Sequence, residues 1–241
     1  MIIFCAAENS FFADVIHKLK VALVDHDRYM YLLNGLKNTL TITVCAAILG
    51  ITIGFIIAAV KVKRRTSIPG RAAVFLADLY LLIIRGTPVT VQLLITYYII
   101  FASSSIDRMA VAILAFGINS GAYSAEIIRG GILAIDNGQT EAGRSLGFSS
   151  LATMRYIIMP QAIKNALPAL CNEAISLLKE TSVAGFIGVV DLTTAALYIK
   201  TATYDAFTPL LILAGVYLIL VIGLTTAVRH LERRLRRGDS H

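Results

Sequence analysis

EAGRSLGFSSLATMRYIIMP, residues 141–160, separates two strongly apolar segments and has the pattern of an element that docks onto another protein. Glu141 and two small residues open a short helical pattern, and Gly147 offers a position where that helix can end with a positive φ at no steric cost. Ser149 or Ser150 then caps a second short helix, whose apolar residues recur at helical spacing: Leu151, Met154, Ile157 and Ile158. Pro160 suits the first turn of a new membrane helix.

The composition around this loop is that of an integral membrane protein. Hydrophobic residues make up 57% of the 241 residues, charged residues only 15%, and the mean hydropathy is +0.75, whereas soluble domains are about 25% charged. The net charge of +7 arises from basic clusters beside apolar runs, which is typical of membrane topology rather than of nucleic-acid binding. The three cysteines are widely spaced and the four histidines lie outside the apolar runs, so neither a disulfide framework nor a metal site is indicated.

Five apolar segments are long enough to cross a membrane core of about 30 Å. They predict an all-α protein with a transmembrane domain over residues 36–230 and spans at residues 36–60, 79–101, 109–128, 161–178 and 208–228. Asp78 marks the cytoplasmic edge of the second span, and the sequence RGTP inside that span must loosen its helix. Residues 181–206 are interrupted by Asp191, so we assign them to the outer face as a short helix that dips in and returns.

The basic residues predict the orientation of these spans. Three predicted inner segments hold five, four and five Lys or Arg residues, whereas each of the two outer loops between spans holds one. We therefore expect the N-terminus outside and the C-terminus inside. Residues 1–35 form an extracytoplasmic amphipathic segment, residues 141–160 a cytoplasmic loop, and residues 231–241 a basic cytoplasmic tail.

Polar residues inside the spans are candidates for a solute path, because such residues are costly in hydrocarbon and usually face the bundle interior. Asn119, Tyr123 and Glu126 share one helix face in the third span. The other candidates lie beside the break in the second span and on two neighbouring faces of the fourth: Arg85, Thr87, Gln92, Asn172, Glu173 and Ser176. Asn119 and Asn172 fall at similar depths near the middle of the membrane.

Each candidate has an alternative explanation. Arg85 can pair with Asp78, which precedes it by seven residues on the same helix face. Glu126 can reach the headgroups or pair with Arg129, and the two amides can serve as hydrogen bonds between helices. The chain has no P-loop and no nucleophile or metal motif near its acids, so we expect it not to be an enzyme and not to hydrolyse ATP itself.

The docking loop resembles the EAA loop of the membrane subunits of ABC importers. In this chain the pattern reads E-A-G, three residues, Gly147, nine residues, Ile157, one residue and M-P. Gly143 and Met159 stand where the family has alanine and leucine, and in both cases the side chain is of similar size. The resemblance implies a coupling helix that sits in a groove of a cytoplasmic ATPase, with these residues at the contact: Glu141, Ala142, Gly143 and Gly147.

A narrower resemblance covers most of the chain from Tyr31 onward. The runs YLLNGLKNTLTIT, LLIIRGTPVTVQLL, FGINSGAYSAEIIRGGI, EAGRSLG and NEAISLLKETSVAGFIGV are similar to permeases of the polar amino acid branch of the ABC importers. This resemblance implies a type I importer fold in a bacterial cytoplasmic membrane and a second permease subunit, identical or paralogous. It also implies an extracytoplasmic amino acid binding protein and an ATPase dimer that holds ATP and Mg²⁺, with no cofactor bound by this chain.

Two other classes of protein remain as alternatives. A membrane scaffold would dock a soluble partner without passing a solute, but it has no reason to place Asn119, Tyr123 and Glu126 along one face. A secondary transporter or channel would not need the docking loop, and five spans without an internal repeat do not suit it as a monomer. Within the permease interpretation, the excess of acids over bases in the third and fourth spans favours a neutral or cationic amino acid as solute.

Overall fold

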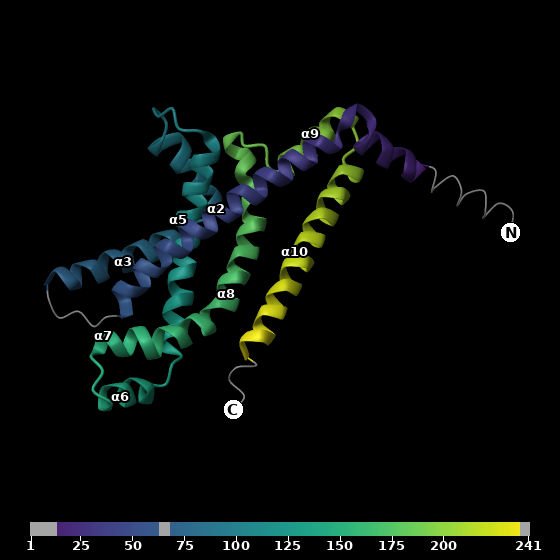
Figure 1. Ribbon diagram of the computed structural model, residues 1–241. Helices are drawn as coiled ribbons and strands as arrows, with labels where there is room; N and C mark the ends of the chain where they lie inside the picture. Colours follow the sequence, from purple (N-terminus) through teal and green to yellow (C-terminus); the bar gives the residue numbers. More distant parts are fainter. Residues whose placement is uncertain (1–13, 63–67, 237–241) are drawn as a thin grey trace.

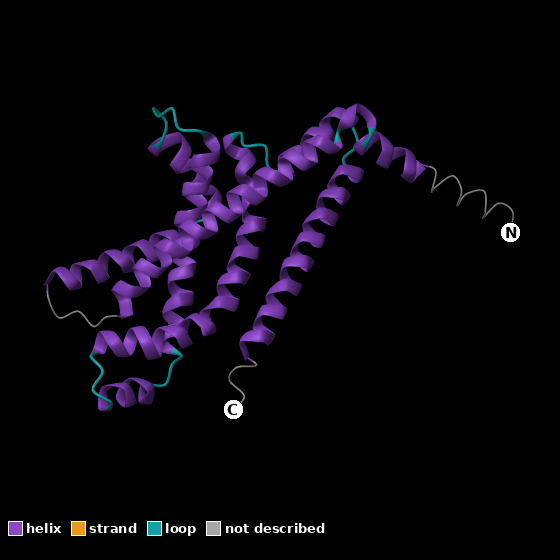
Figure 2. Ribbon diagram, in the orientation of Figure 1, coloured by secondary structure: helices purple, strands orange, loops and turns teal. Residues whose placement is uncertain are grey.

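The computed structural model describes residues 14–62 and 68–236, and all the regular secondary structure in this part of the chain is helical, with short loops between the helices (Figures 1 and 2). Residues 14–23 are helical, followed by η1 Asp25–Asp27, α2 Tyr29–Val62, α3 Ile68–Gly86, α4 Val89–Ile95, η2 Thr96–Ile100, α5 Arg108–Leu133, α6 Asn137–Ser145, α7 Ser150–Thr153, η3 Met154–Ile158, α8 Met159–Glu180, η4 Thr181–Ile187, α9 Leu192–Thr203 and α10 Phe207–Arg236. The predicted all-α class is confirmed for the described residues. Residues 1–13 of the predicted outer segment and residues 237–241 of the predicted tail lie outside the described residues.

Three of these helices are long and apolar enough to cross a membrane in one piece. They are Asp25–Val62, Arg108–Leu133 and Phe207–Leu235. Two bent pairs also pass the same test, Ile68–Gly86 with Val89–Ile100 and Ser150–Ile187 with Leu192–Thr203. Counting each bent pair as one span gives five, so the five-span topology and its orientation stay a prediction.

The second predicted span is not one straight helix. α3 and the helix that follows it are bent by 108° at a break between Gly86 and Val89. Pro88 has an extended conformation there (φ −63°, ψ 138°) and directly precedes α4. Asp78 lies in the middle of α3 and not at its edge, because α3 begins at Ile68. Hydropathy reports the length of an apolar stretch but not the direction in which its helices run. The sequence therefore predicted a loosened helix but not the sharp bend.

The core is centred on α2 and α5, which cross at close range (Figure 1). Gly50 and Gly54 on α2 face Ser120 and Ser124 on α5, and a Cβ atom built at Gly54 would lie 2.6 Å from the Cβ of Ser124. Gly117 packs in the same way against α2, and a Cβ atom built there would lie 2.6 Å from the Cδ2 atom of Leu49. Glycines four residues apart on both helices let the backbones approach, which is how membrane helices associate without a hydrophobic driving force.

α9 packs against the beginning of α2 and forms a fixed corner with it. Asp191 is fully buried, and its carboxylate accepts the backbone N–H groups of Thr193 and Thr194, so it caps α9. Asn38 donates to the carbonyl of Val190 at 2.9 Å, and the Thr39 hydroxyl accepts the N–H of Leu192 at 3.0 Å. Asp191 therefore starts the short outer helix predicted within residues 181–206.

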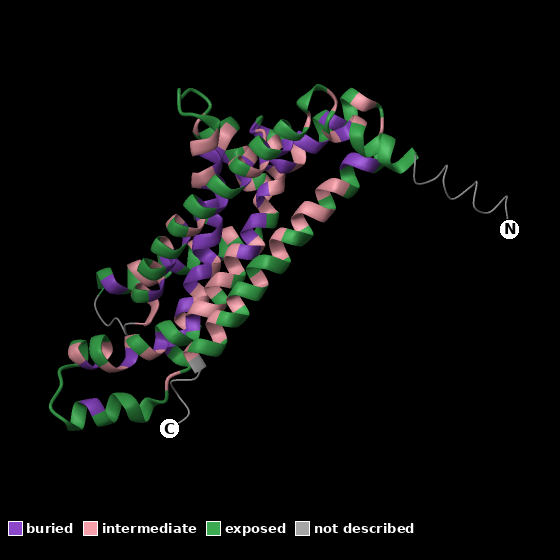
Figure 3. Ribbon diagram, turned by 45° about the vertical axis from the view of Figure 1, so that its right-hand side comes forward, coloured by how far each residue is buried: buried purple, intermediate pink, exposed green. Residues whose placement is uncertain are grey.

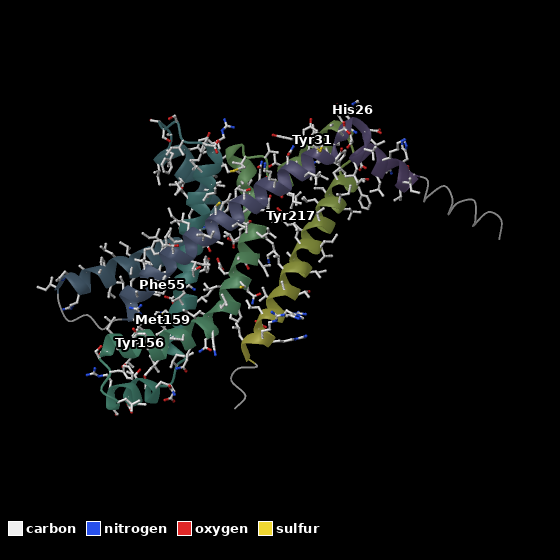
Figure 4. All side chains as sticks on the ribbon, in the orientation of Figure 1. His26, Tyr31, Phe55, Tyr156, Met159 and Tyr217 are labelled. Carbon is white, nitrogen blue, oxygen red and sulfur yellow. The ribbon has the colours of Figure 1, made fainter. Side chains whose placement is uncertain are left out.

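α10 lies along one side of the bundle, beside α8 and α9 (Figures 1 and 3). None of the residues in its most apolar 18-residue window is buried, although the mean hydropathy of that window is 2.5. The hydroxyl of Tyr217, labelled on this helix in Figure 4, lies 3.4 Å from that of Thr193 on α9. An apolar helix this exposed would be unfavourable in water but is ordinary in lipid.

Candidate functional site

The docking loop folds as two short helices joined at Gly147. Gly147 has φ 85°, as the sequence predicted, and it follows the C-cap residue Leu146 at the end of α6. The N–H of Phe148 bonds the carbonyl of Gly143 at 3.1 Å, and the N–H of Gly147 bonds that of Arg144 at 3.0 Å. These two bonds form a Schellman motif, which satisfies carbonyl groups at the end of the helix.

The boundaries of the two loop helices differ slightly from the sequence prediction. α6 begins at Asn137 rather than at Glu141, because the side chain of Asp136 accepts the N–H of Gly138 and caps the helix earlier. Of the two candidate caps for the second helix, Ser149 is the one used, and its hydroxyl accepts the N–H of Ala152 at 3.2 Å. The second helix then continues through a π-helical turn, Met154–Ile158, directly into α8.

The predicted coupling residues divide between two faces of α6. Gly143 is buried, and a Cβ atom there would lie 2.8 Å from side-chain atoms of both Thr153 and Ile157. Its small size therefore serves packing within the loop. Glu141 and Ala142 are exposed and remain available to a partner, together with two exposed apolar side chains of the loop, Leu146 and Leu151 (Figure 3).

A second group of polar side chains surrounds the break between α3 and α4. Gln92 donates through its Nε2 atom to the carbonyl of Ile84 at 2.7 Å and to the hydroxyl of Thr87 at 2.7 Å. The amide of Asn119, which is only 3% exposed on α5, donates to the Oε1 atom of Gln92 at 3.0 Å. Gln92 thus satisfies the backbone at the break and connects it to α5, so these amides act at least in part as interhelical hydrogen bonds.

Arg85 does not pair with Asp78. Asp78 forms an ion pair with Lys61 at the end of α2, at 2.9 Å. The guanidinium of Arg85 instead lies 5.6 Å from the centre of the Tyr123 ring on α5, within cation–π distance. The alternative explanation of Arg85 is therefore wrong in this structure, and the guanidinium remains on the surface of a pocket of about 510 Å³.

Glu126 pairs with cations near the C-terminal end of α5, as its alternative explanation suggested. Its carboxylate lies 2.7 Å from Arg129 and 3.3 Å from Lys61. Six of the nine predicted path residues therefore lie along one seam between α3, α4 and α5: Arg85, Thr87, Gln92, Asn119, Tyr123 and Glu126.

The three candidates on α8 do not join this seam through their hydrogen bonds. Glu173 is half-buried and accepts a hydrogen bond from Ser120 on α5 at 3.1 Å. Asn172 is exposed and Ser176 is half-buried, and within the described part of the chain neither side chain forms a hydrogen bond. The nine residues are thus two groups on neighbouring faces of α5 and not one continuous cluster.

Sequence reasoning missed Lys61 and Ser120 as members of these groups. Lys61 was counted only among the basic residues that indicate topology, and its two acidic partners are far away in the sequence. Ser120 follows Asn119 directly, so it lies off the face that Asn119 shares with Tyr123 and Glu126, and helical spacing did not single it out. The repeated glycines at a spacing of four on α2 and α5 were the available signal for which helices pack together.

The long apolar helices and the broken span define a multi-pass integral membrane protein. Residues 50–237 match the family described as binding-protein-dependent transport system inner membrane component. The chain belongs to this family. It is therefore a transport permease subunit.

Similar proteins carry the names of amino acid permeases. The chain is 38% identical over 211 residues to the arginine transport system permease protein ArtQ of Bacillus subtilis, covering 87% of this chain and 94% of that protein. It is 38% identical over 208 residues to the glutamine transport system permease protein GlnP of Escherichia coli K12, covering 85% and 93%.

Solved structures share the fold. A structure described as an amino acid ABC transporter with histidines has a TM-score of 0.78 and 41% identity, covering 86% of this chain and 94% of the other. An inward-facing MetNI methionine ABC transporter has a TM-score of 0.72 at 21% identity, covering 87% and 98%, and supports the fold alone. The predicted permease fold of ABC importers is confirmed.

Proposed function

We propose that this chain is the membrane subunit of an ATP-driven importer that moves a polar amino acid across a bacterial cytoplasmic membrane. The observation that carries the proposal is the docking loop, a two-helix element with an exposed acidic and small-residue face, in a chain whose relatives are named arginine and glutamine permeases. An extracytoplasmic binding protein delivers the solute. A cytoplasmic ATPase dimer, which holds ATP and Mg²⁺, receives the docking loop.

The proposed topology has five spans, with the N-terminus outside and the C-terminus inside. The three long apolar helices together with the two bent pairs support this number. The arginines at the end of α10 support a cytoplasmic C-terminus. In this orientation α6 and α7, which lie at the same end of the molecule as the C-terminal end of α10 in Figure 1, face the cytoplasm and the ATPase.

The solute path runs beside the break between α3 and α4. A zwitterionic amino acid needs donors for its carboxylate and acceptors for its ammonium group, because an unpaired buried charge costs several kcal/mol. Arg85, which has no carboxylate partner among the described residues, serves the carboxylate together with the loosened backbone near Thr87. Glu173 on α8, which meets the neighbouring face of α5 at Ser120, supplies an acid for an ammonium or guanidinium group. A second permease subunit, identical or paralogous, completes the path.

A cationic or neutral solute fits this distribution of charge. Lys61 and Arg129 already pair with Glu126, whereas Glu173 contacts only the neutral hydroxyl of Ser120 within the described part of the chain. Glu173 is thus a carboxylate without a cationic partner there, and it favours a solute that carries a positive side chain.

A Glu173→Gln variant is expected to lose uptake of a basic solute selectively. Hydrogen bonds to charged groups are worth about 1.5–3 kcal/mol, so ATP-driven uptake of arginine should fall about tenfold or more, and uptake of glutamine should fall much less. The measurement is uptake into vesicles with the binding protein saturated. Glu180→Gln, two turns further along at the C-terminal end of the same helix, is the matched control. Equal uptake of both solutes by variant and parent would remove Glu173 from the path.

Reconstitution tests the proposed function itself. The chain, its ATPase and its binding protein are placed in proteoliposomes, and uptake of labelled arginine, histidine and glutamine is followed with and without ATP inside. ATP-dependent accumulation of at least one amino acid is the expected result. A complex that binds the ATPase and transports none of them would identify the chain as a scaffold.

A further inference from the structure

Lys61 connects three helices at the inner end of the seam. It lies near the end of α2, and its ammonium contacts Asp78 of α3 at 2.9 Å and Glu126 of α5 at 3.3 Å. Its side chain is only 20% exposed, so water screens these pairs less than it screens a surface ion pair. Glu126 also pairs with Arg129 at 2.7 Å. The network therefore holds two carboxylates and two cations.

Arg85 is the additional charge beside this network. It lines the same pocket of about 510 Å³ as Lys61, Asp78 and Glu126. Its guanidinium lies against the Tyr123 ring and has no carboxylate within ion-pair distance among the described residues. The charged residues that line the pocket sum to zero, but Arg129 pairs with Glu126 from outside the lining. Together the five side chains carry one positive charge in excess, which attracts an anionic group.

The absence of an Arg85–Asp78 pair requires an explanation, because the two residues are seven apart on α3. Residues at this spacing lie on the same helix face about 10 Å apart along the axis, and the long side chain of Arg85 can span this distance when it leans toward the N-terminus, as helical side chains do. An arginine and an aspartate so placed attract each other unless the carboxylate already has a partner. Lys61 is that partner.

We propose that Lys61 is a positioning residue: it occupies Asp78 and Glu126 and thereby keeps Arg85 free to bind the α-carboxylate of the transported amino acid. The inference rests on the proposed function. Since the α-carboxylate is common to all amino acids, Lys61 sets the rate of transport and not the choice among solutes. It thus differs from Glu173, whose contribution depends on the side chain of the solute.

The first variant for the test is Lys61→Gln, which releases both carboxylates while retaining a side chain of similar length. Arg85 then pairs with Asp78, which competes with the solute carboxylate for the guanidinium. A partly exposed ion pair is worth up to about 1 kcal/mol, so ATP-driven uptake should fall about fivefold for arginine and glutamine alike. Lys37→Gln is the matched control, because Lys37 lies on the same helix, is exposed and loses the same charge. The control is expected to transport like the parent.

A rescue experiment separates positioning from a purely structural role. In the double variant Lys61→Gln/Asp78→Asn the competing carboxylate is also removed, so uptake should return to within about twofold of the parent. If Lys61 only held α2, α3 and α5 together, the double variant would be as slow as Lys61→Gln or slower. That result, or unchanged uptake by Lys61→Gln, would overturn the inference.

The dependence on Arg85 provides a second check. In an Arg85→Gln background, the further change Lys61→Gln is expected to have no additional effect, because there is no guanidinium left to protect. An additional fivefold loss would also overturn the inference. A failure of the proposed function can be distinguished from these outcomes, because the parent complex itself would then transport no amino acid.

Discussion

A Gly54→Val variant is expected to lose stability because α2 and α5 cannot keep their present separation. A Cβ atom at this position would lie 2.6 Å from the Cβ of Ser124 and 2.8 Å from the backbone nitrogen of Ala125. A backbone atom cannot rotate aside as a flexible side chain can, so the helices must move apart. Overpacking of a tight core costs about 1–3 kcal/mol, occasionally more, and we expect the upper end here.

The measurement is the thermal midpoint of the detergent-purified protein, followed by size-exclusion chromatography after heating. Gly223→Val is the matched control, because Gly223 lies in α10 and an added Cβ atom there meets no atom within 4 Å. The midpoint of Gly54→Val should fall well below that of the control. Equal midpoints for the two variants would show that the close approach of α2 and α5 is not needed for stability.

A Gly147→Val variant is expected to uncouple the subunit from its ATPase while the membrane helices still insert. Gly147 has φ 85°, a conformation that costs an L-residue about 1–2 kcal/mol, and a β-branched side chain is the least tolerant of it. No atom lies within 4 Å of a Cβ atom built there, so the effect comes from the backbone and not from a clash. The Schellman bonds at the end of α6 are lost, and the exposed face of α6 turns away from its partner.

Two measurements check this second prediction. Co-purification of the ATPase and ATP-driven uptake should both fall about tenfold or more, while the amount of chain in the membrane stays the same. Gly147→Asn is the matched control, because asparagine tolerates a positive φ, and it should retain most of both activities. A valine variant that binds the ATPase and transports like the parent would disprove the assignment of the loop.

Local patterns were the part of the structure that the sequence predicted well. Gly147 ends a helix because few other residues accept its φ, and Ser149 caps the next helix because its hydroxyl reaches a free N–H two or three residues on. The shared face of Asn119, Tyr123 and Glu126 follows from helical periodicity alone. Each of these features depends on neighbours within a few residues.

Features that depend on distant parts of the chain were not predictable in the same way. The pairing of Asp78 with Lys61 rather than with Arg85 depends on where the end of α2 meets α3, which periodicity does not report. The packing of Gly143 against Thr153 and Ile157 depends on how the loop folds back on itself. The resemblance to the EAA loop suggested that small residues allow an ATPase to approach, whereas Gly143 allows the loop to approach itself.

The corner between α2 and α9 has a mechanical consequence. Gly35 packs directly against the carbonyl oxygen of Asp191, and hydrogen bonds from Asn38 and to Thr39 join the two segments. α5 is held to α2 equally closely by the glycines farther along. α2, α5 and α9 thus behave as one stiff frame, while the chain between Gly86 and Val89 has no continuous helix to resist bending. α3 is attached to this frame near its middle, where the Tyr80 hydroxyl donates to the carbonyl of Ile118 at 2.6 Å, so a change of angle between the two halves of the broken span would be taken up at the break.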